Sequence, residues 1–195
     1  MSLILAIKTV WAVGVLGWYA IRFPFERRVK RERVALARDR LRERILLSIS
    51  TLGLGIVPGA WVFAGVPAFA DYPASPVQLV AGGLVFAASL WLFRRTHKDL
   101  GKNWSVTLEI KDRHKLITAG VYRYVRHPMY SAFFLWALAQ LILLPNWIAA
   151  PAGFIGFGTL FAFRVGREEA MMLESFGDEY RAYMARTARV IPGVF

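Results

Sequence analysis

The 195-residue chain contains no cysteine and only three histidines, His97, His114 and His127. The absence of cysteine excludes disulfides, thiolate nucleophiles and cysteine-ligated metal clusters, and it leaves the redox compartment undetermined. The histidines do not form a paired i, i+4 motif, and no neighbouring acid completes a ligand set. We therefore expect no metal site.

Acidic residues are also scarce, with 13 Asp and Glu against 25 Lys and Arg, although 56% of the chain is hydrophobic. A chain that is both apolar and basic must separate the two characters in space. Its basic stretches lack the interleaved aromatic residues or the known module of a nucleic-acid-binding protein. We expect no nucleic-acid partner.

Long apolar runs are present, and a run of about 20 residues matches the hydrocarbon thickness of a bilayer. Five candidates cover residues 2–21, 45–69, 77–93, 129–144 and 147–163. The last two are separated only by Pro145 and Asn146, which predicts a tight hairpin. The first is not expected to be a cleavable signal peptide, because its basic cluster follows the apolar stretch. The predicted fold class is all-α: one membrane domain over residues 1–195, with about five transmembrane helices.

The cations indicate an orientation. Ten of the 25 lie in residues 22–44, nine in 94–127 and five in 164–195, leaving only Lys8 elsewhere. In a five-span protein these three segments fall on one side, which the positive-inside rule makes the cytoplasm. We expect an outer N-terminus, a cytoplasmic C-terminus and an integral membrane location. The Ala- and Arg-rich composition favours a bacterial source, and thus the inner membrane.

Two polar segments need separate interpretation. Residues 26–45 are predicted to be helical and can serve either as a membrane-surface anchor or as a solvated extension of the second span. Residues 94–127 form a connection too long and too rich in aromatic and aliphatic side chains to be a disordered linker. We expect this segment to fold against its neighbours.

The candidate chemistry lies in "HKLITAGVYRYVRHPMY" (114–130) and "FRVGREE" (163–169). Taken singly, these residues have plain structural interpretations: Pro128 can start a helix, and the tyrosines can line the membrane interface. Arg164 and Glu168 are four residues apart on one helix face and can form a simple ion pair. They can also hold a zwitterion or a charged acceptor, since a guanidinium matches a carboxylate.

The ordered set H-x-L-I-x-x-G-V-Y-x-x-x-R-H-P-x-Y, an apolar hairpin, R-x-x-x-E-E, F-G-x-E-Y and a terminal I-P resembles the isoprenylcysteine carboxyl methyltransferase family. More broadly, it resembles the integral-membrane methyltransferases that include phospholipid N-methyltransferases. The resemblance covers about residues 97–193. It implies a methyltransferase core over residues 94–195, with residues 1–93 shaping access for the acceptor.

The resemblance also implies an S-adenosylmethionine pocket at the cytoplasmic face, built from the 94–130 loop and the C-terminal helices. Arg164 would bind the lipophilic acceptor, and Arg164 and Glu168 together would be the catalytic pair. The cofactor would be held by His114, Leu116, Ile117, Tyr122, His127, Pro128, Tyr130 and Glu168.

Several functions remain open from the sequence. The acceptor can be a prenylcysteine-type carboxylate, a phospholipid amine or a small lipophilic thiol or acid. An amine would require a base, for which Glu168, Glu169 and His127 are candidates. The alternative classes are an NADPH-dependent membrane reductase and a non-enzymatic membrane scaffold. The reductase would bind NADPH in place of S-adenosylmethionine, and the scaffold would bind neither cofactor.

Overall fold

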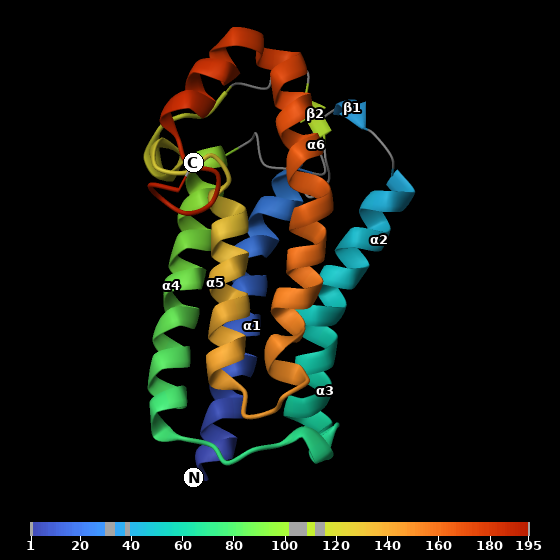
Figure 1. Cartoon of the computed structure of the whole chain (residues 1–195), viewed down its shortest axis with the longest axis vertical. Helices are drawn as coiled ribbons and strands as arrows, with labels where there is room; N and C mark the ends of the chain where they lie inside the picture. Colours follow the sequence, from blue (N-terminus) through green and yellow to red (C-terminus); the bar gives the residue numbers. More distant parts are fainter. Residues whose placement is uncertain (1, 30–33, 38–39, 102–108, 112–115, 195) are drawn as a thin grey trace.

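The computed structural model describes residues 2–29, 34–37, 40–101, 109–111 and 116–194, and within these residues five helical segments run lengthwise through one bundle (Figure 1). They are α1 (Leu3–Val29), the continuous run of α2 (Arg40–Thr51), the π-helical turn η1 (Leu52–Ile56) and α3 (Val57–Ala64), then α4 (Pro76–Leu100), α5 (Pro128–Leu143) and α6 (Ala149–Arg186). The two termini lie at opposite ends of the bundle. Short 3-10 turns occur at Ala68–Ala70 (η2) and Gly120–Arg123 (η4).

The helix lengths agree with the predicted apolar runs. Among the residues that the structure describes, four segments are long and apolar enough to cross a membrane, namely Leu3–Arg27, Leu41–Ala64, Pro76–Leu100 and Ala149–Arg186. The fifth, α5, has 16 residues and is shorter than a usual span. The α6 helix has 38 residues, and its part before Gly177 is about 42 Å long at 1.5 Å per residue, so it extends beyond a bilayer core. Its backbone is kinked at Gly177.

A two-stranded antiparallel sheet is added to the predicted all-α fold. Strand β1 (Val34–Ala37) pairs with β2 (Glu109–Lys111) at the bundle end that carries the C-terminus (Figure 1). The prediction of one helix over residues 26–45 was therefore wrong, because α1 ends at Val29 and α2 begins at Arg40. Backbone pairing with a segment far along the chain overrides the local helix propensity.

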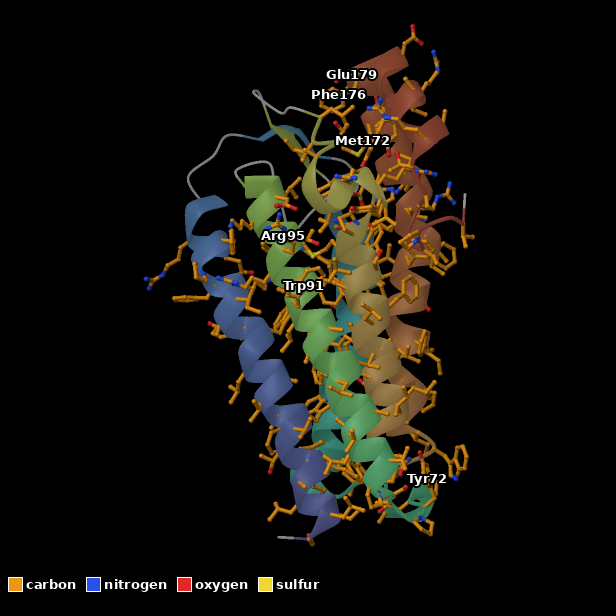
Figure 2. All side chains as sticks on the ribbon, turned by 90° about the vertical axis from the view of Figure 1, so that its left-hand side faces the viewer. Tyr72, Trp91, Arg95, Met172, Phe176 and Glu179 are labelled. Carbon is orange, nitrogen blue, oxygen red and sulfur yellow. The ribbon has the colours of Figure 1, made fainter. Side chains whose placement is uncertain are left out.

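Large apolar side chains cover much of the outer surface of the bundle. Leu16, Phe63, Leu84 and Ile155 are each more than 65% exposed, whereas Trp136 is buried in the centre. So many large, exposed apolar side chains are unusual for a water-soluble protein and are expected where lipid replaces water. Figure 2 shows the length of the bundle, with Tyr72 at one end and Glu179 at the other.

The predicted hairpin between α5 and α6 is held by Asn146, which is fully buried. Its Nδ2 donates to Asp71 Oδ1 at 2.7 Å, and its Oδ1 accepts from the backbone N–H of Ala149 at 2.8 Å. Trp61 also donates to Asp71, at 2.5 Å. One amide side chain therefore joins the start of α6 to the loop before α4.

The π-helical turn η1 ends two residues before Pro58, whose ring would clash with the carbonyl of Leu54 in a regular α-helix. The wider turn relieves this clash and leaves the Gly53 carbonyl to accept from Gln140 Nε2 at 3.2 Å. Gly53 also lies against the backbone of α6, where an added Cβ would be 2.2 Å from the Ala152 oxygen. Small residues thus let the two helices approach closely, as in other membrane bundles.

We expect Gly53→Val to lower stability by about 1–3 kcal/mol, because the new side chain must push α6 away. Gly55→Val is the matched control, since a Cβ there meets nothing within 4 Å and lies in the same turn. Thermal unfolding in detergent measures both. Equal losses in the two variants would contradict close packing at Gly53.

Candidate functional site

The start of α5 is fixed between the loop before it and the C-terminal tail. The backbone N–H groups of Arg126 and His127 donate to the carbonyls of Ala188 and Arg189 at 2.9 and 3.0 Å. His127 occupies the N-cap position of α5 without a side-chain capping hydrogen bond, and Pro128 lies in the first turn, where the missing proline N–H costs no hydrogen bond. The side chains of His127 and Tyr130 therefore project from a rigid helix start toward α6.

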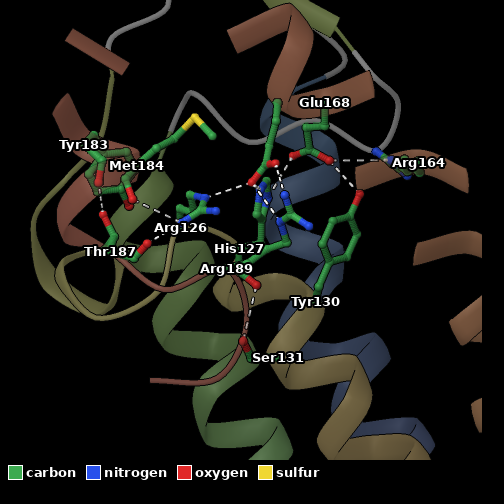
Figure 3. Close-up of polar contacts among 11 residues, drawn as sticks. Arg126, His127, Tyr130, Ser131, Arg164, Glu168, Tyr183, Met184, Thr187 and Arg189 are labelled. Atoms are coloured by element: carbon green, nitrogen blue, oxygen red, sulfur yellow. Dashed lines mark hydrogen bonds and ion pairs between the residues drawn. The ribbon is translucent and has the colours of Figure 1, made fainter. Parts of the chain in front are cut away.

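Both of these side chains contact Glu168 on α6 (Figure 3). The Tyr130 hydroxyl donates to Glu168 Oε2 at 2.6 Å, and His127 Nδ1 lies 3.7 Å from Glu168 Oε1. The Glu168 side chain nevertheless keeps 33% of its surface exposed. A carboxylate that is held in place yet accessible can accept further hydrogen bonds from a ligand.

Glu169, the next residue, is buried and fully engaged. Arg126 Nε lies 2.8 Å from its Oε1, Arg189 Nη2 lies 2.7 Å from its Oε2, and His127 Nε2 lies 3.2 Å from its Oε1. Arg126 also donates to the carbonyls of Met184 and Thr187. Glu169 therefore ties together the loop before α5, helix α6 and the C-terminal tail.

Arg164 lies one turn before Glu168 and forms a buried ion pair across the bundle. Its Nη1 is 2.8 Å from Oε1 of Glu43 on α2, and its Nε is 3.8 Å from Glu168 Oε2. The predicted pair of Arg164 and Glu168 is thus adjacent in space. Glu43 joins this pair from a part of the chain in which no site residue was predicted.

Tyr122 lies in η4 behind this cluster, and its side chain is buried. The turn is held by Asp99, which accepts from the Val121 N–H at 3.0 Å, and by the Tyr183 hydroxyl, which donates to the Tyr122 carbonyl at 2.6 Å. Burial and then the negative charge of Glu168 raise the pKa of the Tyr122 phenol well above its usual value. The phenol therefore stays protonated near Glu168.

The structure brings together His127, Tyr130, Arg164 and Glu168, and it places Tyr122 near them. Leu116 and Ile117 lie half-buried just before η4, whereas His114 lies outside the described residues.

Sequence reasoning missed the parts played by Glu43, Arg126 and Arg189. Arg126 could have been found from its place in "RHP", but the partners of Glu43 and Arg189 depend on long-range packing. In the described part of the chain, no cluster of three His, Asp or Glu residues is placed to hold a metal ion.

His127 is the titratable group of the cluster that responds near neutral pH. Burial lowers its pKa, but the hydrogen bonds and charges of Glu168 and Glu169 raise it by more, so the net pKa lies above the ordinary value. When protonated, the ring donates through both nitrogens. The ionic contacts with Glu168 and Glu169 are then complete.

We expect stability to fall as the pH rises above neutrality. The contribution of His127 is fully present below the unfolded-state pKa of about 6.5 and is lost as the pH rises through the raised folded-state pKa. Each unit of the raised pKa corresponds to about 1.4 kcal/mol. Thermal unfolding from pH 5.5 to 9 measures this loss, and His127→Gln should flatten the profile. An equally steep profile in that variant would assign the effect to another group.

These features define a multi-pass integral membrane protein with a charged, partly accessible site at one end of its helical bundle. Residues 81–174 match the model of the isoprenylcysteine carboxyl methyltransferase (ICMT) family. The predicted resemblance is confirmed: over this region the chain is similar to that family.

Named relatives and a solved structure agree with this resemblance. The chain is 35% identical to the protein-S-isoprenylcysteine O-methyltransferase of Dictyostelium discoideum over 48% of this chain and 40% of that protein. It is 33% identical to the human protein of the same name over 46% of this chain and 32% of that protein. A solved eukaryotic intramembrane Ras methyltransferase ICMT superposes with a TM-score of 0.55 at 25% identity, covering 82% of this chain and 55% of that one. The chain thus spans less than half the length of these curated relatives, while the structural likeness extends into its N-terminal half.

Proposed function

We propose that this protein is an S-adenosylmethionine-dependent methyltransferase that acts at the membrane interface on a lipophilic acceptor. The acceptor that we propose is a prenylcysteine-type carboxylate. The match to the family model and the names of the relatives support the reaction class. The observation that carries the proposal is Glu168, oriented by Tyr130 and His127 yet one-third exposed. An accessible, oriented carboxylate suits the ammonium or ribose hydroxyls of such a cofactor.

The residues present fit this cofactor. When bound, it supplies an electrophilic methyl group on a sulfonium. Glu168 would bind its polar groups, and the raised pKa of Tyr122 keeps a neutral phenol at the back of the site. The complete proposed set is His114, Leu116, Ile117, Tyr122, His127, Pro128, Tyr130 and Glu168. Residues 94–195 would form this core, and residues 1–93 would shape acceptor access.

Arg164 would position the acceptor, and with Glu168 it forms the proposed catalytic pair. A carboxylate is already a nucleophile, so the protein needs to align it and exclude water without removing a proton. The guanidinium of Arg164 would offset the cost of bringing that anion to an apolar boundary. A cytosolic cofactor and a lipid-dissolved acceptor would meet where the charged end of the bundle joins its apolar surface.

The proposed orientation places this site in the cytoplasm, with the N-terminus outside. Termini at opposite ends of the bundle are consistent with an odd number of spans. The basic segments 22–44, 94–127 and 164–195 would then face the cytoplasm. In a bacterial source the membrane would be the inner one, although the relatives named above are eukaryotic.

The direct test incubates purified protein with methyl-labelled S-adenosylmethionine and separate prenylcysteine, phospholipid-amine and small-thiol acceptors. We expect label in the prenylcysteine ester. Label in another acceptor class would correct the substrate but keep the reaction. Stabilisation by NADPH, with none by S-adenosylmethionine, would indicate a reductase. Binding of neither cofactor would indicate a scaffold.

The variant Arg164→Ala distinguishes an effect on the acceptor from an effect on the cofactor. We expect acceptor kcat/KM to fall by about 100-fold, as misplacement of a reacting group can cause, while the S-adenosylmethionine Kd changes little. Calorimetry and the transfer assay measure the two quantities. Equal losses of acceptor kcat/KM and of S-adenosylmethionine affinity would contradict the assignment of Arg164 to the acceptor.

A further inference from the structure

Glu43 is a buried carboxylate that neither the family motifs nor the family-matched region explains. It lies near the start of α2 with 5% of its surface exposed, and its Oε1 is 2.8 Å from Arg164 Nη1. The family match begins at residue 81, so Glu43 belongs to the part of the chain outside it. The N-terminal half therefore contributes a charged group directly to the cluster.

A buried ion pair is a weak means of stabilising a fold, because desolvation of both charges offsets their attraction. Such a pair is useful where a charged side chain must be held in one place. An arginine side chain is long and flexible, and a buried ion pair restricts where its guanidinium can lie. Glu43 contacts Arg164 through one such ion pair, between Oε1 and Nη1, and Arg164 Nε lies 3.8 Å from Glu168 Oε2.

The chain of contacts has a clear order. Glu43 on α2 contacts Arg164 on α6, Arg164 lies beside Glu168, and Glu168 is held from α5 by Tyr130. Three helices thus set the position of two charges that lie next to each other. In this series of contacts Glu43 and Tyr130 are the two end members, and Glu43 is the one that contacts Arg164.

We propose that Glu43 is a positioning residue for the acceptor step: it fixes and partly neutralises Arg164, and through Arg164 it determines how well the acceptor is aligned. This inference rests on the proposed function. It assigns to the N-terminal half a specific chemical part in turnover, in addition to shaping access. The consequence is that loss of the Glu43 charge should affect the acceptor and leave the cofactor unaffected.

The test uses the full-length protein in detergent or vesicles. Glu43→Gln keeps the size of the side chain and removes its charge. We expect acceptor kcat/KM to fall about 10- to 100-fold, the range that misalignment produces, with the S-adenosylmethionine Kd within about twofold of the parent value. Asp178→Asn is the matched control, because it removes a carboxylate from an ion pair on α6 whose Asp178 side chain is 92% exposed. It should leave both quantities unchanged.

A double-mutant cycle with Arg164→Gln tests whether Glu43 acts through Arg164. The double variant should be no worse in acceptor kcat/KM than Arg164→Gln alone, because the two residues form one unit. Independent, multiplying losses would overturn the proposal. Parallel losses of thermal stability and of affinity for both ligands would also overturn it, since they indicate a purely structural pair.

Glu43→Asp provides a second variant should the glutamine protein fail to fold. It keeps the buried charge but shortens the reach to Arg164, so the same selective loss is expected. Normal acceptor turnover by either folded variant would refute the positioning role while leaving the proposed function intact. Absence of methyl transfer by the parent protein to every acceptor would instead refute the proposed function, and this inference with it.

Discussion

Replacement of Glu168 by Gln should largely abolish S-adenosylmethionine binding while the protein remains folded. The substitution keeps the shape of the side chain and a partner for the Tyr130 hydroxyl, which donates at 2.6 Å in the parent protein. It removes the negative charge that faces His127 and the accessible edge of the site. Loss of a charge that pairs with a ligand costs about 2–5 kcal/mol, or roughly a 30- to 5,000-fold weaker Kd.

Calorimetric titration with S-adenosylmethionine measures this effect directly. Asp178→Asn is the matched control, since the Asp178 side chain lies on the same helix and is 92% exposed. It should bind the cofactor like the parent protein. Normal cofactor affinity in Glu168→Gln, combined with lost methyl transfer, would move Glu168 to the acceptor side of the site.

The number and placement of the helices could be predicted because they follow from the length of apolar runs. Membrane spans satisfy their backbone groups locally, so a run such as 77–93 is sufficient to locate α4. Residues 26–45 show where this reasoning fails. Their helix propensity is real, but β1 pairs with β2 from a distant loop, and local sequence carries no record of that partner.

In the site, too, the features that follow from local sequence could be predicted, and those that depend on distant partners could not. The spacing of Arg164 and Glu168 places them on one face of a helix, and "RHP" marks the start of α5, so both positions could be predicted. That His127 and Tyr130 face Glu168 depended on the resemblance to a known family. The pairing of Glu43 with Arg164 could not be predicted from either source, because it depends on how α2 packs against α6.

Replacement of Glu169 by Ala should cause the largest loss of stability at this end of the bundle. Its carboxylate is 6% exposed and pairs with Arg126, Arg189 and His127. Removal of one member of a buried ionic cluster leaves the others without compensation and costs about 3–5 kcal/mol. The tail that carries Arg189 would lose its contact with α6, although Ser131 would still donate to the Val190 carbonyl at 2.6 Å.

Unfolding in detergent, by heat or by added dodecyl sulfate, measures the loss, and limited proteolysis reports on the tail. Glu179→Ala is the control on the same helix and should cost little, since exposed charges contribute less than about 1 kcal/mol. Arg189→Ala should fall between the two, because the Arg189 side chain is 46% exposed. A Glu169→Ala protein as stable as Glu179→Ala would contradict this assignment and place the stability of the region in the backbone contacts between residues 125–127 and 188–189.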